Sequence, residues 1–432
     1  MRLRDHATTF RAVNQEKRLL STPSLSPYFI LLTGQIGSWF GSELVQFALV
    51  WWLTKTTGQA AVLTLATTIA VLPSIFVGPF AGALVDRWNR RMVMMAADGV
   101  IAGATLLLAL LFASGWVQLW QVYAILLIRA LAGVFHQPAI LATTPLLVPE
   151  KHLARVAGLN QSLYGLVAIL APPFGALLLE WFPMSAILAI DVVTAAIAIG
   201  SLLFLTIPQP ARTVVAGAEK LMRAVLTDLY AGLRFIWRFT GLRLMLTLVA
   251  LPAMLGWPMM TLIPLLITKH FDGGAFELGW FQSVFAIGSI LGGFLLTAWG
   301  GFQRRIHTWL VALILGGLAL TLVGLMPADA LLWAAAAWFM AGIMSALING
   351  ASLTIFQTVV PEAMLGRVFA LQLAIVTSLS PLGLYVAGQV ADRFGAAIWF
   401  VLAGSGYALA GLIAPFIPAL MRIEEKGAHT AP

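Results

Sequence analysis

Four ionisable residues stand inside long apolar stretches of this sequence: Glu43, Asp98, Arg129 and Asp191. A charge at the centre of a bilayer costs roughly 2.5–3.5 kcal/mol or more, so each of these residues requires a partner or a role. Burial favours the neutral form of a carboxyl group, whereas a neighbouring guanidinium favours the ionised form. A carboxylate whose access to an arginine changes with conformation could therefore bind a proton on one side of a membrane and release it on the other.

Arg129 and Glu43 are expected at similar depths in the membrane. Counted from the outer ends of their stretches at ~1.5 Å per residue, Arg129 lies about 16 Å deep and Glu43 about 15 Å deep. These two side chains could therefore face each other near the middle of the membrane, with Asp98 on the inner side and Asp191 on the outer side. The hypothesis is that Glu43, with Asp98 or Asp191, carries a proton; the alternative is a permanent ion pair that only fastens helices together. His136, two helical turns after Arg129, is expected to pack or to form a hydrogen bond.

The charged residues stand out because the chain is otherwise apolar. Of its 432 residues, 60% are hydrophobic and 10% are charged, whereas a soluble domain has about 25% charged residues. Twelve mainly apolar stretches are long enough to cross a hydrocarbon core about 30 Å thick. They cover 28–53, 60–85, 92–113, 118–146, 157–180, 185–207, 242–268, 276–300, 308–326, 330–357, 366–391 and 395–421. The sequence thus predicts an all-α membrane protein with twelve transmembrane helices.

The distribution of basic residues predicts how the chain is oriented. The first twenty residues are polar and basic, so no cleavable signal peptide is expected. Most Lys and Arg residues fall in alternate connecting segments, which predicts a plasma (inner) membrane protein with both termini in the cytoplasm. This placement accounts for the net charge of +8 without nucleic acid. The chain has no cysteine, no G-x-x-x-x-G-K-[ST] loop and no H-E-x-x-H helix, so we expect no enzyme, ATP-driven pump, cofactor or metal site.

Two short internal sequence repeats indicate a duplication. LVPEKHLARV (147–156) returns as VVPEAMLGRV (359–368), with its shared residues 212 positions apart, and GPFAGALVDRWNRR (78–91) returns in part as GGFLLTAWGGFQRR (292–305), at an offset of 214. Two halves that carry the repeated segments in the same order predict parallel structural repeats. In transporters such repeats rock against each other around a central site. The predicted domains are six-helix bundles at 28–207 and 242–421, cytoplasmic tails at 1–27 and 422–432, and a linker at 208–241 that contains a basic amphipathic helix.

One motif carries a family resemblance. The segment G-A-L-V-D-R-W-N-R-R (82–91) fits the pattern G-x-x-x-D-R-x-G-R-[RK] with one departure, Asn89 for Gly. With this motif the chain resembles the major facilitator superfamily. Within this superfamily the chain looks like the drug-exporter branch, which contains macrolide efflux pumps and the enterobactin exporter. The segments that carry this likeness are LVWWLTKTTG, GPFAGALVDRWNRRMVM, HQPA and LAIDVVT.

The resemblance implies a conformational latch at this motif. Gly78 and Gly82 form a G-x-x-x-G face that lets a neighbouring helix approach closely. In the family the motif aspartate, here Asp86, holds the halves together in one conformation, and an anion suits the N-terminus of a partner helix. The departure at Asn89 is mild, because asparagine also tolerates a left-handed turn conformation. The motif arginines are expected to anchor to phosphate headgroups or only to set topology; they are Arg87, Arg90 and Arg91.

Further matches point to export and to a substrate cavity. Arg129-x-x-x-Gly133 resembles the family's helix 4 motif, whose arginine is linked to proton transfer. The segment A-P-P-F-G-A (171–176) resembles the antiporter motif of helix 5, which implies that its proline and glycine residues bend the helix and contact the other half; they are Pro172, Pro173 and Gly175. Six side chains are predicted to line a cavity for bulky amphipathic ligands: Trp39, Phe40, Gln46, Phe47, Trp257 and Met259.

The resulting hypothesis is a monomeric, proton-coupled exporter of amphipathic small molecules, such as macrolide-like drugs or siderophores. A second interpretation within the fold is an importer or a lysophospholipid transporter. A third is a membrane receptor or scaffold that transports nothing, although the buried charges would then have no purpose.

Overall fold

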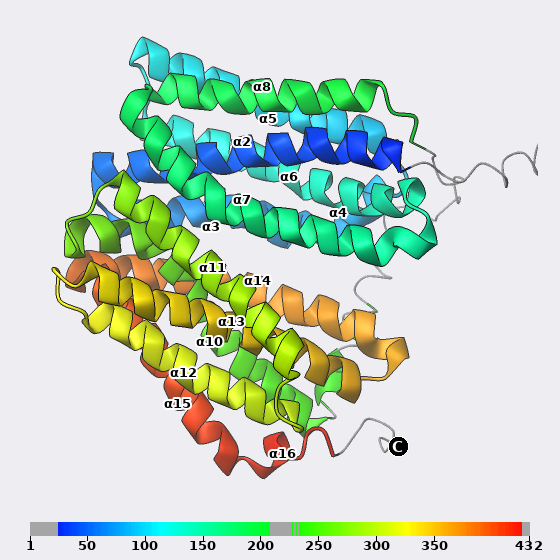
Figure 1. The fold of residues 1–432 in the computed structure, drawn as a ribbon, viewed down its shortest axis with the longest axis vertical. Helices are drawn as coiled ribbons and strands as arrows, with labels where there is room; N and C mark the ends of the chain where they lie inside the picture. Colours follow the sequence, from blue (N-terminus) through cyan, green and yellow to red (C-terminus); the bar gives the residue numbers. More distant parts are fainter. Residues whose placement is uncertain (1–24, 208–226, 228–229, 231–232, 238, 426–432) are drawn as a thin grey trace, which may run out of the picture.

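The described part of the chain is entirely helical. The computed structural model describes residues 25–207, 227, 230, 233–237 and 239–425 (Figure 1). The first half contains α2 (Ser26–Thr57), α3 (Ala60–Phe76), α4 (Gly78–Val85), α5 (Arg90–Ser114), α6 (Leu119–Leu147), α7 (Leu153–Trp181) and α8 (Met184–Leu203). The second half contains α10 (Thr240–Leu265), α11 (Ala275–Trp299), α12 (Arg305–Leu325), α13 (Leu331–Val359), α14 (Glu362–Phe394) and α15 (Ala396–Ile413).

Each predicted membrane span is helical in the structure. The predicted and observed helices differ mainly at their ends. The second span is divided at Val77 into α3 and α4. The last span ends at Ile413 rather than at 421, and two short helices follow, η3 (Ala414–Phe416) and α16 (Pro418–Met421). Among the described residues, nine helices are long and apolar enough to cross a membrane, and α3 is a shorter apolar helix. The prediction of an all-α membrane protein is confirmed. Residues 1–24 and most of the predicted amphipathic linker lie outside the described residues.

The helices form two groups, one above the other in Figure 1, and both groups use the same pattern of contacts. In the first group α8 packs on α2 and α5, α6 packs on α3 and α5, and α7 packs on α2. In the second group α15 packs on α10 and α12, α13 packs on α11 and α12, and α14 packs on α10. Each pair in one group has its counterpart at the same ordinal positions in the other group. This correspondence is what a duplicated six-helix unit produces.

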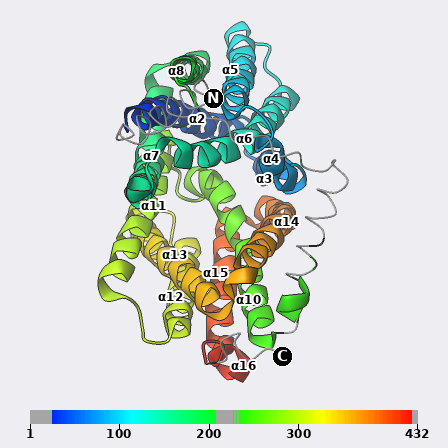
Figure 2. The same ribbon diagram turned by 90° about the vertical axis from the view of Figure 1, so that its right-hand side faces the viewer.

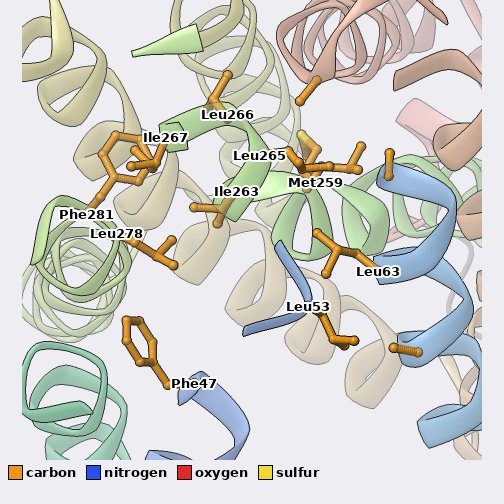
Figure 3. Packing of buried hydrophobic residues seen from close by; sticks show 14 of the residues in the cluster. Phe47, Leu53, Leu63, Met259, Ile263, Leu265, Leu266, Ile267, Leu278 and Phe281 are labelled. Atoms are coloured by element: carbon orange, nitrogen blue, oxygen red, sulfur yellow. The ribbon is translucent and has the colours of Figure 1, made fainter. Parts of the chain in front are cut away.

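The two groups meet through α3 with α14 and α7 with α11 (Figure 2). We call the end of the molecule where α2 begins (Ser26) the tail end, and the end where α2 stops and α3 starts (Thr57–Ala60) the far end. One cluster of buried apolar side chains joins the groups towards the far end. Figure 3 shows members of this cluster from both groups, among them Phe47, Leu53 and Leu63 of the first and Met259 and Ile263 of the second. The groups are therefore held together by a shared apolar core as well as by polar contacts.

Local sequence sets several of the helix ends. Gly58 ends α2 with φ 60° and Gly115 ends α5 with φ 75°, a left-handed backbone that glycine adopts without strain. Asn89 begins α5: its Oδ1 accepts a hydrogen bond from the Met92 N–H at 3.2 Å. Asn89 does not use the left-handed backbone that asparagine tolerates, since φ there is −68°. Asn89 serves instead as an N-cap, a position that asparagine favours.

Candidate functional site

A cavity of about 390 Å³ lies within the first helix group and contains most of the membrane-embedded charge. Its walls come mainly from α2, α5, α6 and α7. Glu43, Asp98 and Arg129 line it, together with His136, and Trp39 and Gln46 are also part of its wall. The cavity reaches from Tyr28, near the tail end, to the middle of the molecule.

Arg129 pairs with Asp191. Its Nη1 lies 2.5 Å from Asp191 Oδ2, and the Asp191 side chain is fully buried. The same carboxylate accepts hydrogen bonds from Thr105 Oγ1 at 3.0 Å and from Ser42 Oγ at 2.8 Å, and Arg129 also donates to Thr105. This cluster joins α2, α5, α6 and α8. A buried charge is tolerated when it is paired and hydrogen-bonded in this way.

Arg129 and Glu43 line the same cavity. Among the described residues, the acidic partner in the ion pair of Arg129 is Asp191. A residue count along a helix gives the depth of a side chain and not its direction around the helix axis, so the sequence did not give this partner. Ser42 and Thr105 were not predicted at all; each is a polar residue within an apolar span, and this is the only signal the sequence offers for them.

A second polar cluster surrounds Asp98. His136 Nε2 lies 3.0 Å from Asp98 Oδ1, and Gln35 Nε2 donates to Asp98 Oδ2 at 3.1 Å. The three residues come from α6, α5 and α2, and the Asp98 side chain is 3% exposed. The His136 ring thus lies beside a buried carboxylate, and Gln35 is a partner that sequence reasoning missed. Asp98 and Asp191 both receive donors from neighbouring helices.

Glu43 differs from the two buried aspartates. Its carboxylate accepts one hydrogen bond, at 3.1 Å, from the indole N–H of Trp39 on the same helix. The ion pairs among the described residues do not include it. The Trp39 ring packs edge-on against Tyr164 with centroids 4.3 Å apart. Glu43 also lines a second cavity of about 240 Å³, so it lies at the boundary between two cavities.

The second cavity and a third one complete the centre of the molecule. The cavity of about 240 Å³ is lined from both helix groups, by Gln46 and Phe47 of the first and by Trp257 and Thr261 of the second. A cavity of about 460 Å³ lies in the second group and includes Trp257 and Met259. Five of the six predicted cavity residues therefore line one of these spaces. The sixth, Phe40, packs against Phe174 with ring centroids 6.1 Å apart and is not among the lining residues.

The motif at 82–91 is folded locally in this structure. Asp86 Oδ1 lies 3.1 Å from Arg90 Nη2, and the Asp86 side chain is 65% exposed. Arg90 Nη1 donates to the Ala142 carbonyl oxygen at 2.8 Å and Arg91 Nη2 to that of Leu203 at 2.9 Å. These arginines thus tie the start of α5 to α6 and to the end of α8. Arg87 is partly buried beside them.

The predicted close approach at Gly78 and Gly82 is absent in this conformation. A Cβ added to either glycine would meet no atom within 4 Å. A close helix contact would place neighbouring atoms inside that distance. The described contacts of Asp86 likewise involve Arg90 rather than a helix of the second group. Within the part of the chain that the structure describes, Asp86 therefore does not make the contact with the second group that the family resemblance implies.

The proline-containing segment of α7 touches the second group directly. A Cβ on Gly279 of α11 would lie 2.8 Å from the Pro172 carbonyl oxygen and 2.9 Å from Pro173 Cα. Ser283 Oγ of α11 donates to the Ile169 carbonyl oxygen at 2.5 Å. Pro173 has no N–H, so within α7 it cannot bond that carbonyl four residues earlier. A serine from the other half supplies the missing donor. Gly175 faces the first group instead, against Phe47.

Comparison with known proteins places these features in a family. A sequence profile described as Major Facilitator Superfamily matches residues 31–383. Macrolide efflux protein A of Streptococcus pyogenes is 31% identical over 399 residues, which cover 92% of this chain and 98% of that protein. Multidrug efflux pump Tap of Mycolicibacterium fortuitum is 26% identical over 411 residues, covering 92% and 97%. The crystal structure of the nucleoside transporter NupG matches with a TM-score of 0.69 at 15% identity, covering 93% of this chain and 100% of that one.

Two groups of membrane-spanning helices around internal cavities, together with this family match, identify a multi-pass membrane transporter rather than an enzyme. The chain belongs to the major facilitator superfamily, and among its relatives are macrolide efflux protein A and the multidrug efflux pump Tap.

Proposed function

We propose that this protein exports amphipathic small molecules, such as macrolide-like drugs or siderophores, in exchange for protons by alternating access. Efflux is the activity in the names of the relatives described above, macrolide efflux protein A and the multidrug efflux pump Tap. The observation that carries the proposal is the position of Glu43 at the boundary of two cavities. A carboxyl group at such a point can exchange a proton with either side as the halves rock.

Glu43 is the best candidate for the proton carrier because its carboxylate is the least compensated of the three. Asp191 is bound by Arg129, Thr105 and Ser42, whereas from the described residues Glu43 accepts only the hydrogen bond of the Trp39 N–H. In the proposed cycle Arg129 and Asp191 keep the helices around Glu43 in place, and Asp98 with His136 forms a second polar group nearer the tail end. A small change in the distance between Glu43 and Arg129 would then change the proton affinity of Glu43.

The central cavities suit a substrate with a large apolar surface. Trp257 lines both the middle cavity and the cavity of the second group, where Met259, Met260 and Phe285 surround it. Aromatic and methionine side chains adapt to bulky ligands of different shape. The amide side chains of Gln46, Gln282 and Asn349 add a few polar contacts. The substrate would thus bind between a charged wall and an apolar wall.

In this proposal the tail end faces the cytoplasm. The basic connecting segments, which include Arg87, Arg90 and Arg91, lie at that end of the helices, as the positive-inside rule requires. The far-end contacts between the halves then close the outer side, and the charged cavity is reached from the cytoplasm. The protein acts as a monomer in the plasma membrane.

Glu43→Gln tests the proposal. In inside-out vesicles with an imposed proton gradient, the native chain should accumulate a radiolabelled macrolide, and Glu43→Gln should reduce proton-driven uptake to that of empty vesicles. Glu180→Gln is the matched control, because Glu180 is exposed near the end of α7. Thermal unfolding would check that each variant is folded. Full uphill transport by Glu43→Gln would contradict the proposed role of Glu43.

The same vesicles separate the alternative functions. Accumulation in right-side-out vesicles only would indicate an importer, and uptake of a labelled lysophospholipid without macrolide uptake would indicate a lipid transporter. A receptor or scaffold would bind a ligand but move none of these compounds in either orientation.

A further inference from the structure

Asp392, near the end of α14, contacts the other helix group. Its Oδ1 accepts a hydrogen bond from the Ala60 backbone N–H at 2.6 Å, and its Oδ2 accepts one from the Ala61 N–H at 2.9 Å. These are the first two N–H groups of α3, which would otherwise lack acceptors at the start of the helix. Gln59, in the N-cap position, makes no capping bond with its own side chain. The second half of the molecule therefore caps a helix of the first half.

The Asp392 carboxylate stabilises the start of α3 in two ways, through hydrogen bonds and through its negative charge. The start of an α-helix carries a partial positive charge, and a carboxylate that accepts two of its free N–H groups satisfies both the charge and the hydrogen bonds. Asp392 is solvent-exposed at the far end, so it can leave this position without transferring a bare charge into an apolar interior.

Gly388, one helical turn before Asp392, makes the approach of the two helices possible. A Cβ at Gly388 would lie 2.5 Å from Thr64 Oγ1 and 3.2 Å from Ala61 Cα. Gly388 and Asp392 are four residues apart and thus lie on one face of α14. That face packs against the first turns of α3, so the glycine and the aspartate act on the same contact.

The sequence around this contact has the same pattern as the tail-end motif. Residues 388–393 read G-Q-V-A-D-R, and residues 82–87 read G-A-L-V-D-R. The first copy lies at the C-terminal end of α14, at the far end of the molecule. The second lies at the C-terminal end of α4, at the tail end. The α3–α4 segment and α14 run antiparallel, because α14 ends where α3 begins. Each copy therefore lies at the end of the molecule where the partner helix starts.

The aspartates of the two copies differ in the contacts they make. Asp392 of the far-end copy is bound to the start of α3. Asp86 of the tail-end copy is 65% exposed and pairs with Arg90 of its own segment. Gly388 is packed tightly, whereas Gly82 has open space beside it. Among the described contacts, Asp392 thus bonds to the other half, whereas Asp86 pairs within its own half.

We propose that Asp392 is the far-end latch of the transport cycle, and that the two G-x-x-x-D-R copies are engaged alternately. The Asp392 contact holds α3 against α14 in the conformation described here and breaks when the far end opens. The assignment rests on the alternating access of the proposed function, but it does not depend on the substrate or on protons.

Hydrogen exchange measured by mass spectrometry on the protein in lipid nanodiscs tests the latch. In Asp392→Asn the carboxylate charge is lost while the side chain keeps its size, and loss of a charge at a helix N-terminus should raise exchange at the start of α3 about fivefold. If Asp392 holds the halves together, exchange should also rise at 276–284 in α11, which contacts α7 and not Asp392. Asp392→Ala should give the same pattern.

Asp329→Asn is the matched control. Asp329 is an exposed aspartate in the connection between α12 and α13, and this connection also lies at the far end; its replacement should change neither region. Faster exchange at the start of α3 alone would reduce Asp392 to a local helix cap and overturn the proposal, and unchanged exchange in both regions would overturn it too. The measurement uses no drug and no proton gradient, so it stays decisive even if the export assay fails.

Discussion

At the scale of single residues, the Asp191 carboxylate is the most completely bound charge in the described structure. Side chains from three other helices reach it: Ser42, Thr105 and Arg129. Such a buried pair adds little net stability over an apolar replacement, but the removal of one partner leaves an uncompensated charge. This asymmetry makes it possible to separate the structural role of the pair from a role in transport.

Asp191→Ala should therefore be strongly destabilising. It leaves the Arg129 guanidinium, whose side chain is 11% exposed, without its counter-charge, and the expected loss is about 3–5 kcal/mol in the free energy of unfolding. The double variant Arg129→Met/Asp191→Leu should recover most of this loss. Denaturant unfolding in mixed micelles measures both. A double variant as unstable as Asp191→Ala would contradict the explanation, and a stable double variant that still exports would show that the pair only fastens helices.

The sequence predicted which residues carry buried charge, but not how they pair. Hydropathy identifies Glu43, Asp98, Arg129 and Asp191 because a charge stands out in an apolar span. Pairing depends on the rotation of each helix and on which helices are neighbours. Asp191 on α8 reaches Arg129 on α6 because both helices pack on α5, and no local sequence pattern contains that information.

At the scale of helices, proline and glycine residues shape the contact between α7 and α11. Pro173 leaves the Ile169 carbonyl free for Ser283, and Gly279 allows the two backbones to touch. The span predictions were accurate because twenty apolar residues determine a helix almost without regard to context. The break at Val77 was not predicted; Pro73 lies inside α3 and Pro79 follows the break, but prolines elsewhere in this chain are accommodated within continuous helices, as in α7.

Gly279→Ala should weaken this contact between the halves. The new Cβ would lie within 3.0 Å of the Pro172 backbone, and overpacking of this kind costs about 1–3 kcal/mol. Gly293→Ala, on the same helix, is the control: its Cβ would meet nothing within 4 Å, so helix propensity should leave stability unchanged or raise it by about 1 kcal/mol. Thermal unfolding compares the two. Equal midpoints for both variants would show that the contact at Gly279 does not restrict side-chain size.

At the scale of the whole molecule, the duplication was visible in the sequence but the conformation was not. The sequence repeats at offsets of 212 and 214 residues predicted two halves with their helices in the same order. The matching contact pairs in the two groups agree with that prediction. Which end of the molecule is closed depends on a small energy difference between two packings of the same surfaces. The far-end contacts at Asp392 and Ser283 therefore had to be found in the structure.

A cross-link between the halves should stop transport if the halves must move. The hydroxyl oxygens of Thr67 on α3 and Thr261 on α10 lie 3.2 Å apart, close enough for a disulfide in Thr67→Cys/Thr261→Cys after small side-chain rotations. The chain has no cysteine of its own, so this bond would be the only one formed. We expect macrolide export by the oxidised double variant to fall to background and to return after reduction. The two single variants, treated with the same oxidant, should keep their activity, since neither can form the bond within one chain. Export by a fully cross-linked protein would mean that α3 and α10 stay together throughout the cycle, and the movement of the halves would then have to take place elsewhere.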